Sequence, residues 1–276
     1  MAVDRVTLMG IAHAERMRLG RTIQYAPPES WEAPSACEGW WNRDVVAHMS
    51  AQDTAAAQLV KGDAATELDA YRDSVDADVF TVDGFNAVAV NRRSGLQVRE
   101  VLTQWGQAAD SFLAFAALLT DDEWASERIP WLSGDIALPY LVQSRIIEWW
   151  LHGEDMRATN GLGPNVQHWP VFLVCDMGIR MLPWALARAG LDFHGLSVQV
   201  DLEGAGYGSW HWGLGAGETP PEDKKPDAYI QGRALQFALV AGRRLPAREV
   251  LDAGTLVVGG EAELGELILT HIRAYV

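Results

Sequence analysis

Apolar and polar residues alternate with a helical period along the first part of the chain. Residues 4–25 predict a helix, because Asp4 is a suitable N-cap and apolar side chains recur on one face. The prolines of the following segment APPESWEAPS end that helix. A second helix is expected from Asn42 to Gly62, since an alanine-rich run starts there at a capping residue and stops at a glycine.

Two further long helices are predicted by the same rules. Residues 94–119 predict the third, with Ser94 and Gln97 in capping-box spacing. The fourth is expected to run from about Tyr140 to Thr159, where asparagine and glycine follow. The polar stretch 63–78 is expected to be a loop. Four long helices with connections of varied length favour an antiparallel bundle.

The pattern changes beyond the apolar segment 168–190, in which Pro183 predicts a kink and which we expect to join two domains. Strand-like alternation in LSVQVDL is followed by a glycine-rich turn and a returning strand, and strands and helices then alternate to the end. The predicted fold class is α+β, with an N-terminal four-helix bundle over residues 1–163 and a connector helix plus a small mixed α/β domain over residues 164–276. The GLGAG of residues 213–217 lacks the βαβ context of a dinucleotide-binding loop.

Composition and charge narrow the partners of the protein. Hydrophobic residues make up 49% of the chain and charged residues 21%, which predicts a globular protein with a core. The formal charge of -15 repels nucleic acid and anionic membranes, so we expect neither as a partner. The chain shows no signal-peptide pattern and no run of about 18 apolar residues, and a cytoplasmic location is expected. Two cysteines, Cys37 and Cys175, are too few for a disulfide framework, and both are expected to be structural.

The segment IIEWWLHGEDMR, residues 146–157, carries a pattern with chemical meaning. Glu148 and His152 lie one turn apart on the predicted helix, and Asp155 follows on the same stripe. A carboxylate with two imidazoles is a common donor set for a catalytic zinc ion, and His48 of the second predicted helix can supply the other imidazole. The same spacing fits an ordinary pair on a helix surface, so spacing alone does not decide between the two interpretations.

Two separated motifs resemble a known family. The segment PSACEGWWNRDVVAHMSAQ is similar to the opening of the mycothiol-dependent maleylpyruvate isomerase N-terminal domain, part of the DinB-like helical bundle superfamily, and RIIEWWLHGEDMR resembles its second hallmark. The resemblance implies a metal triad of His48, Glu148 and His152, with Asp155 as an acidic neighbour. The C-terminal segments DAYIQGRALQFALVAGR and GTLVVGGEAEL resemble the small α/β domain of this family, which is similar to sterol-carrier modules.

What the resemblance implies about function is a zinc enzyme. Zn²⁺ would hold the thiol of mycothiol as a thiolate, which adds to an electrophilic substrate, either in a cis–trans isomerase of the maleylpyruvate type or in an S-transferase. One alternative is a non-catalytic module that retains the bundle and binds a hydrophobic ligand. Another is an iron site, because two histidines and one carboxylate also form the facial triad of oxygen-dependent enzymes.

Further site residues follow from the same resemblance. Arg243 matches the substrate-side arginine of the family and is expected to act in catalysis and cofactor binding by pairing with a carboxylate, with Arg244 or a structural ion pair as alternatives. Asp155 is expected to bond a ligand imidazole or to touch the thiol cofactor. Trp149 and Trp150 point in different directions on a helix, so at most one can line the site, and Trp149 is the one expected to contact the cofactor.

Overall fold

The computed structural model describes residues 3–76 and 79–275. The chain divides into two compact units, Met1–Asn165 and Val166–Val276. The first unit consists mainly of helices, and the second combines helices with a four-stranded sheet. The α+β class predicted from the sequence is therefore confirmed.

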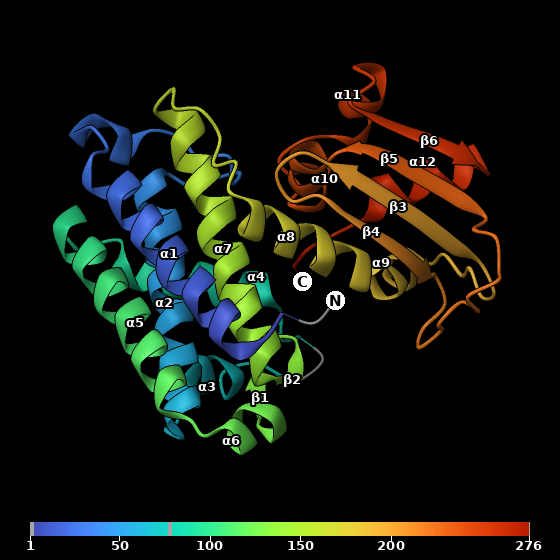
Figure 1. Ribbon diagram of the computed structural model, residues 1–276. Helices are drawn as coiled ribbons and strands as arrows, with labels where there is room; N and C mark the ends of the chain where they lie inside the picture. The colour runs from blue at the N-terminus through green and yellow to red at the C-terminus, as the bar shows by residue number, and fades with distance from the viewer. Residues whose placement is uncertain (1–2, 77–78, 276) are drawn as a thin grey trace. The chain divides into compact units, whose positions relative to one another are not determined.

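Four long helices build the first unit: α1 (Arg5–Gln24), α2 (Asn42–Lys61), α5 (Val98–Leu118) and α7 (Leu138–Thr159). Helix α1 contacts α5 and α7, and α2 contacts the same two helices, so that the four close into a bundle (Figure 1). Large side chains such as Trp105, Phe112 and Trp149 fill its interior, where each is 2% exposed or less. Their burial is the main stabilising contribution to the bundle.

Local sequence signals fix the ends of these helices. The carboxylate of Asp4 accepts a hydrogen bond from the backbone N–H of Thr7 at 3.0 Å and so caps α1, as predicted. Helix α2 ends at Gly62, whose φ of 84° lies in the left-handed region that favours glycine. Pro139 occupies the first turn of α7, where its missing N–H costs no hydrogen bond.

The predicted start of the third long helix is wrong by four residues. Ser94 does not cap α5 but follows the last residue of a separate helix, α4 (Val82–Arg93), and its hydroxyl donates back to the carbonyl of Asn91. The capping box of α5 is formed instead by Gln97 and Glu100, whose carboxylate accepts from the Gln97 N–H at 2.8 Å. Ser94 is thus the C-cap residue of α4, and Gln97 is the N-cap of α5.

The loop predicted for residues 63–78 is also only partly correct. Helix α3 (Thr66–Arg72) occupies its middle, and residues 77 and 78 lie outside the described part of the chain. Leu68 is fully buried and Tyr71 is 7% exposed, so that two apolar anchors hold a helix that is otherwise polar. Such a short helix depends on tertiary packing more than on its own periodicity. The remaining elements of this unit are η1 (Pro28–Glu32), α6 (Asp121–Ser126) and the hairpin of β1 (Arg128–Trp131) and β2 (Gly134–Ala137).

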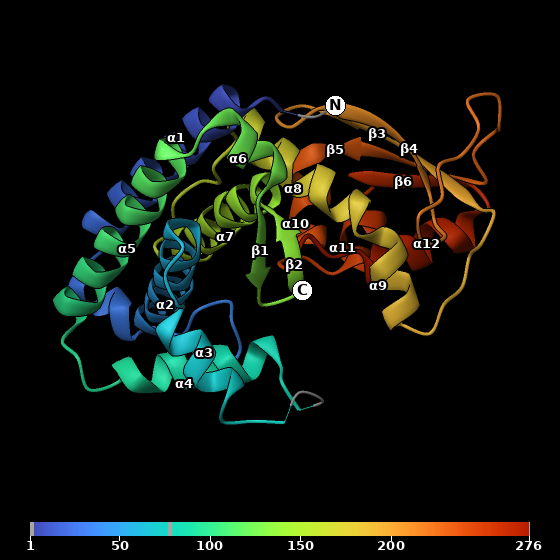
Figure 2. The same cartoon turned by 90° about the horizontal axis from the view of Figure 1, so that it is seen from below.

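The second unit begins with two helices, α8 (His168–Arg180) and α9 (Leu182–Arg188), which meet at 52° next to Pro183, where a kink was predicted. Its sheet has the order β4-β3-β5-β6, and β3 runs parallel to β5 and antiparallel to β4 (Figure 2). The strands are β3 (Ser197–Glu203), β4 (Gly208–Gly213), β5 (Ala228–Arg233) and β6 (Leu256–Gly260), and the helices between and after them are α10 (Ala234–Ala241), α11 (Ala247–Asp252) and α12 (Ala262–His271). Helices α10 and α12 pack against the sheet.

Across residues 3–76 and 79–275, no single helix has the length and apolar character needed to cross a membrane. Only α8 and α9 taken together reach that criterion, as a bent pair.

Candidate metal centre

Helices α2 and α7 carry the three predicted metal ligands. His48 lies in the second turn of α2, and Glu148 and His152 lie one turn apart on the same face of α7. Contacts between the two helices pair His48 with Glu148 and Asp53 with Arg145, so residue numbers rise along one helix as they fall along the other. The two helices are therefore antiparallel, and this arrangement brings together residues that are 100 positions apart in the sequence.

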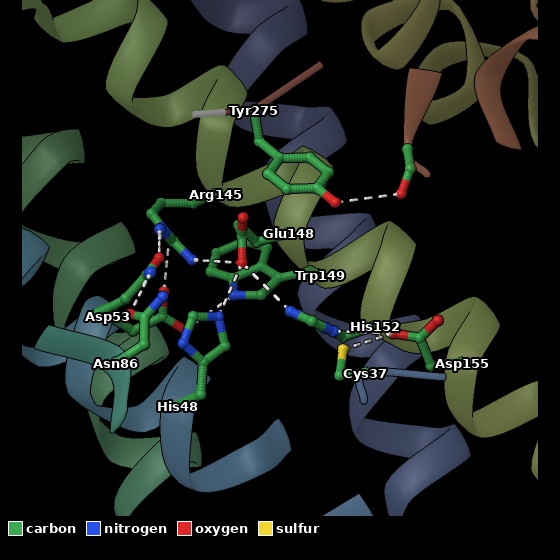
Figure 3. A network of polar contacts seen from close by, with 12 residues as sticks. Cys37, His48, Asp53, Asn86, Arg145, Glu148, Trp149, His152, Asp155 and Tyr275 are labelled. Atoms are coloured by element: carbon green, nitrogen blue, oxygen red, sulfur yellow. Dashed lines mark hydrogen bonds and ion pairs between the residues drawn. The ribbon is translucent and has the colours of Figure 1, made fainter. Parts of the chain in front are cut away.

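The three side chains converge on one point, and we name them the ligand cluster (Figure 3). The Nε2 atom of His48 lies 3.1 Å from Oε2 of Glu148, and Nε2 of His152 lies 3.3 Å from the same oxygen. The two imidazole rings are 5.2 Å apart between centroids and nearly perpendicular. The prospective ligand atoms all lie within 4.8 Å of one another.

This donor set suits a divalent cation. All three groups bind metals through lone pairs, and two imidazoles with one carboxylate match the ligands of catalytic zinc sites. All three also lie inside the bundle, where the side chain of Glu148, at 15%, is the most exposed. Ligand atoms this close together and away from water need a proton or a metal cation between them. The residues present therefore fit a metal ion.

The pKa shifts in the ligand cluster follow from the same arrangement. Burial opposes ionisation of Glu148, yet hydrogen bonds from His152 and His48 and the charge of Arg145 outweigh it and hold the pKa of this carboxyl well below its usual value. Burial also opposes protonation of His152, but hydrogen bonds to Asp155, Cys37 and Glu148 raise its pKa well above the ordinary value. Burial lowers the pKa of His48. Without a metal, the imidazolium of His152 supplies the positive charge.

Asp155 contacts the ring nitrogen of His152 that does not face Glu148. Its Oδ2 is 2.9 Å from Nδ1 of His152, and because an ionised carboxylate only accepts hydrogen bonds, Nδ1 carries the hydrogen. The lone pair of the neutral imidazole then lies on Nε2, which faces Glu148. A carboxylate in this position orients a ligand histidine and fixes its tautomer.

Cys37 lies closer to this site than the sequence indicated. Its Sγ is 3.8 Å from Oδ2 of Asp155, and Cys37, His152 and Asp155 form a second group of closely spaced ligand atoms. The loop before α2 places the thiol there, and the side chain is partly exposed. Cys175, in contrast, is buried in α8 of the second unit, and burial raises the pKa of its thiol.

Trp149 does not lie at a surface that a ligand could reach. It is fully buried, its indole N–H donates to Oδ2 of Asp53 at 2.8 Å, and its ring meets Phe112 edge to face. The surroundings of Trp149 therefore place it in the bundle core and give no support to the predicted cofactor contact. Trp150 is equally buried and donates to the carbonyl of Asn165.

Arg243 belongs to the second unit, directly after α10. It has a φ of 59°, which is uncommon for a residue other than glycine, and its guanidinium donates to the carbonyl of Thr270 at 2.9 Å. The neighbouring Arg244 donates to the carbonyl of Gly242. Arg243 is exposed and Arg244 is half-buried. The role of Arg243 toward a substrate stays a prediction.

Comparison with known proteins bears on the whole chain. A model of the mycothiol maleylpyruvate isomerase N-terminal domain family matches residues 12–157, more than half of the chain and all of the ligand cluster. A crystal structure of the mycothiol-dependent maleylpyruvate isomerase superposes with a TM-score of 0.63 at 12% identity, over 94% of this chain and 95% of the other. A histidine-to-alanine mutant of that isomerase gives the same TM-score and coverage at 11% identity.

At such low identity the superposition establishes a shared fold. No protein of curated function matches the chain significantly in sequence. The family match rests on an independent comparison and spans both ligand-bearing helices of the bundle. The chain belongs to the mycothiol maleylpyruvate isomerase N-terminal domain family.

Proposed function

We propose that the protein is a zinc-dependent enzyme that activates the thiol of mycothiol for addition to an electrophilic small molecule. The observation that carries this proposal is the convergence of His48, Glu148 and His152 on one point within the family domain. The mycothiol-dependent isomerase of the same fold gives the thiol its identity in this proposal.

The residues of the ligand cluster would hold the metal. A zinc ion with three protein ligands keeps a fourth position open, where it stabilises a thiolate over a thiol. Of the three ligands, His152 is the best prepared to bind a metal. Asp155 holds the hydrogen on its Nδ1 atom, so that Nε2 is the ligand atom. Glu148 stays ionised at neutral pH, since its pKa is held well below the ordinary value.

The electrophile is expected to carry a carboxylate. A carboxylate pairs with the planar fork of an arginine, and this is the role proposed for Arg243. Addition of a thiol to an activated double bond leaves a single bond, about which rotation is free. Loss of the thiol then gives the trans isomer, and retention of the adduct gives a thioether, so one site serves isomerase and S-transferase chemistry alike.

Neither cysteine of the chain is required as the nucleophile. Cys175 is buried and its raised pKa keeps it as a thiol, while the Cys37 thiol donates a hydrogen bond to Asp155. The proposal therefore assigns the reacting sulfur to the cosubstrate.

The test combines metal content with thiol-dependent turnover. We expect about one zinc per chain in the purified protein, and conversion of maleylpyruvate or another unsaturated carboxylate only when mycothiol is added. His48→Ala is expected to lose both properties, while His194→Ala, which removes an exposed histidine paired with Glu218, keeps both. A metal-loaded protein without thiol-dependent turnover would refute the enzyme, and binding of apolar ligands without metal would favour the non-catalytic alternative.

A further inference from the structure

Helix α7 buries a guanidinium one turn before Glu148. Arg145 is 1% exposed, and a charge at such a position is costly unless it is paired and hydrogen-bonded. Its Nε donates to Oδ1 of Asp53 at 2.8 Å, and its Nη1 donates to Oε1 of Gln52 at 2.5 Å. The guanidinium also lies over the ring of Trp131, 5.7 Å from its centroid.

The acceptors of Arg145 are themselves fixed. The second oxygen of Asp53 accepts hydrogen bonds from the indoles of Trp105 at 3.1 Å and Trp149 at 2.8 Å, and the amide of Gln52 donates to Asn86 on α4. We name Gln52, Asp53, Trp105, Arg145 and Trp149 the Asp53–Arg145 cluster. Because helices α2, α5 and α7 all contribute to it, the guanidinium cannot turn without breaking several buried hydrogen bonds.

One donor of this guanidinium is left over and points at the ligand cluster. Nη2 of Arg145 is buried and has no hydrogen-bond partner within the described part of the chain. It forms an ion pair with Oε2 of Glu148 at 3.8 Å. Figure 3 shows Arg145, His48 and His152 approaching Glu148 from different directions. All three reach the same oxygen.

A purely structural role explains only part of this geometry. Pairing with Asp53 and Gln52 uses Nε and Nη1 and is sufficient to anchor two helices. It leaves a buried cationic N–H without an acceptor, which costs stability. The position of Nη2 beside Glu148 gives this donor a purpose, since a hydrogen bond or ion pair to a ligating carboxylate sets the orientation of that ligand.

We propose that Arg145 is a positioning residue of the metal centre, which holds Glu148 so that a single oxygen faces the two imidazoles. The inference rests on the metal site of the proposed function. A carboxylate held through one oxygen contributes one ligand atom and leaves a position free for the sulfur of the cosubstrate. Arg145 contacts neither the metal nor the substrate in this account and acts through Glu148.

The test compares two matched arginine variants of the full-length protein. Arg145→Lys keeps the charge and loses the fork. Arg93→Lys makes the same change at another buried arginine, whose fork binds Glu67 at 2.7 and 2.9 Å and contacts no residue of the ligand cluster. Both variants are expected to lower the melting temperature of the metal-free protein. Zinc affinity, measured by chelator competition, is expected to fall about 10- to 100-fold in Arg145→Lys and to stay within about twofold of the wild type in Arg93→Lys.

A second variant keeps the inference testable should Arg145→Lys not fold. Gln52→Met removes the acceptor of Nη1 and loosens the guanidinium, and a several-fold loss of zinc affinity is expected. The visible spectrum of the cobalt-substituted protein reports ligand geometry independently of stability. Wild-type zinc affinity and an unchanged cobalt spectrum in the folded variant would overturn the role of Arg145. A wild-type protein that binds no metal would instead refute the proposed function.

Discussion

Helices α2 and α7 bury two polar clusters within one turn of each other, and the two are built in opposite ways. In the Asp53–Arg145 cluster each carboxylate oxygen of Asp53 accepts at least one hydrogen bond, from a cation on one side and from two indoles on the other. In the ligand cluster, two imidazoles and a carboxylate direct their ligand atoms at a common point. The first cluster balances its own charge, and the second is completed by a cation.

The difference separates a structural role from a chemical one. The Asp53–Arg145 cluster pairs its cation with its own carboxylate and contributes to a unique packing, with only the Nη2 donor of Arg145 left over. A buried cluster of acceptors is unfavourable alone, and here a proton on His152 fills the place of the cation. Substitutions in the first cluster should therefore affect folding most and reach metal binding only through the contact of Arg145 with Glu148, whereas substitutions in the second should affect metal binding most.

Asp53→Ala is expected to have the largest effect, on stability. The substitution leaves the guanidinium of Arg145 buried without its counter-charge and two indole N–H groups without an acceptor. We expect the free energy of unfolding of the metal-free protein to fall by about 3–5 kcal/mol, measured by urea denaturation. A loss below about 1 kcal/mol would mean that the Asp53–Arg145 cluster does not stabilise the bundle.

His48→Ala is expected to affect zinc affinity strongly and stability less strongly. Removing a ligand is expected to lower zinc affinity by at least about 100-fold, more than the loss of a partner behind a ligand costs. The free energy of unfolding of the metal-free protein should fall by less than in Asp53→Ala, because His48 makes one hydrogen bond, from Nε2 to Glu148, and its Nδ1 atom has no partner among the described residues. Calorimetric zinc titration and urea denaturation of the same preparation check both parts, and unaltered zinc binding would contradict the assignment.

Asp155→Asn tests whether support behind a ligand matters. The amide is a weaker acceptor for the Nδ1–H of His152, so zinc affinity is expected to fall about 10-fold. Glu154→Gln is the matched control. The carboxylate of Glu154, the residue before Asp155, accepts a hydrogen bond from the backbone N–H of Asn165 and contacts no residue of the ligand cluster. Equal zinc affinities of the two variants would remove Asp155 from the site.

The pH dependence of zinc binding sharpens the comparison further. The raised pKa of His152 keeps its imidazole in the protonated, cationic form at neutral pH in the metal-free protein. The lowered pKa of His48 keeps that imidazole neutral. Zinc must displace the proton of His152, so apparent affinity should rise by about tenfold per pH unit until the pH exceeds that pKa. Calorimetry in two buffers of different ionisation enthalpy should count one proton released per zinc near pH 7, and no release would contradict the account.

The sequence predicted the long helices because their caps and apolar periodicity are local signals. It failed where tertiary contacts decide the structure, as in α3, which Leu68 and Tyr71 anchor, and in the competition between Ser94 and Gln97 for the start of α5. Such contacts join segments that are distant in the sequence, so they produce no periodic pattern of apolar residues.

The metal site was only partly predictable from the sequence. The spacing of Glu148 and His152 predicted two of the three residues of the ligand cluster. His48 was a candidate for the third, and only the family resemblance tied it to the other two, because nothing in the spacing links positions on separate helices. Arg145 and Asp53 were missed for the same reason, although a charge within the apolar sequence of α7 and another in the alanine-rich α2 were available signals. The burial of Trp149 was not predictable either, because tryptophan occurs in protein cores and at ligand sites alike.

One measurement tests the central claim most directly. X-ray absorption at the zinc edge of the Cys37→Ser variant, loaded with zinc and mycothiol, reports which atoms surround the metal, and in this variant Cys37 cannot supply the sulfur. The account predicts imidazole scattering together with one sulfur at about 2.3 Å that appears only when mycothiol is added. A metal surrounded by nitrogen and oxygen alone, with or without the thiol, would contradict it.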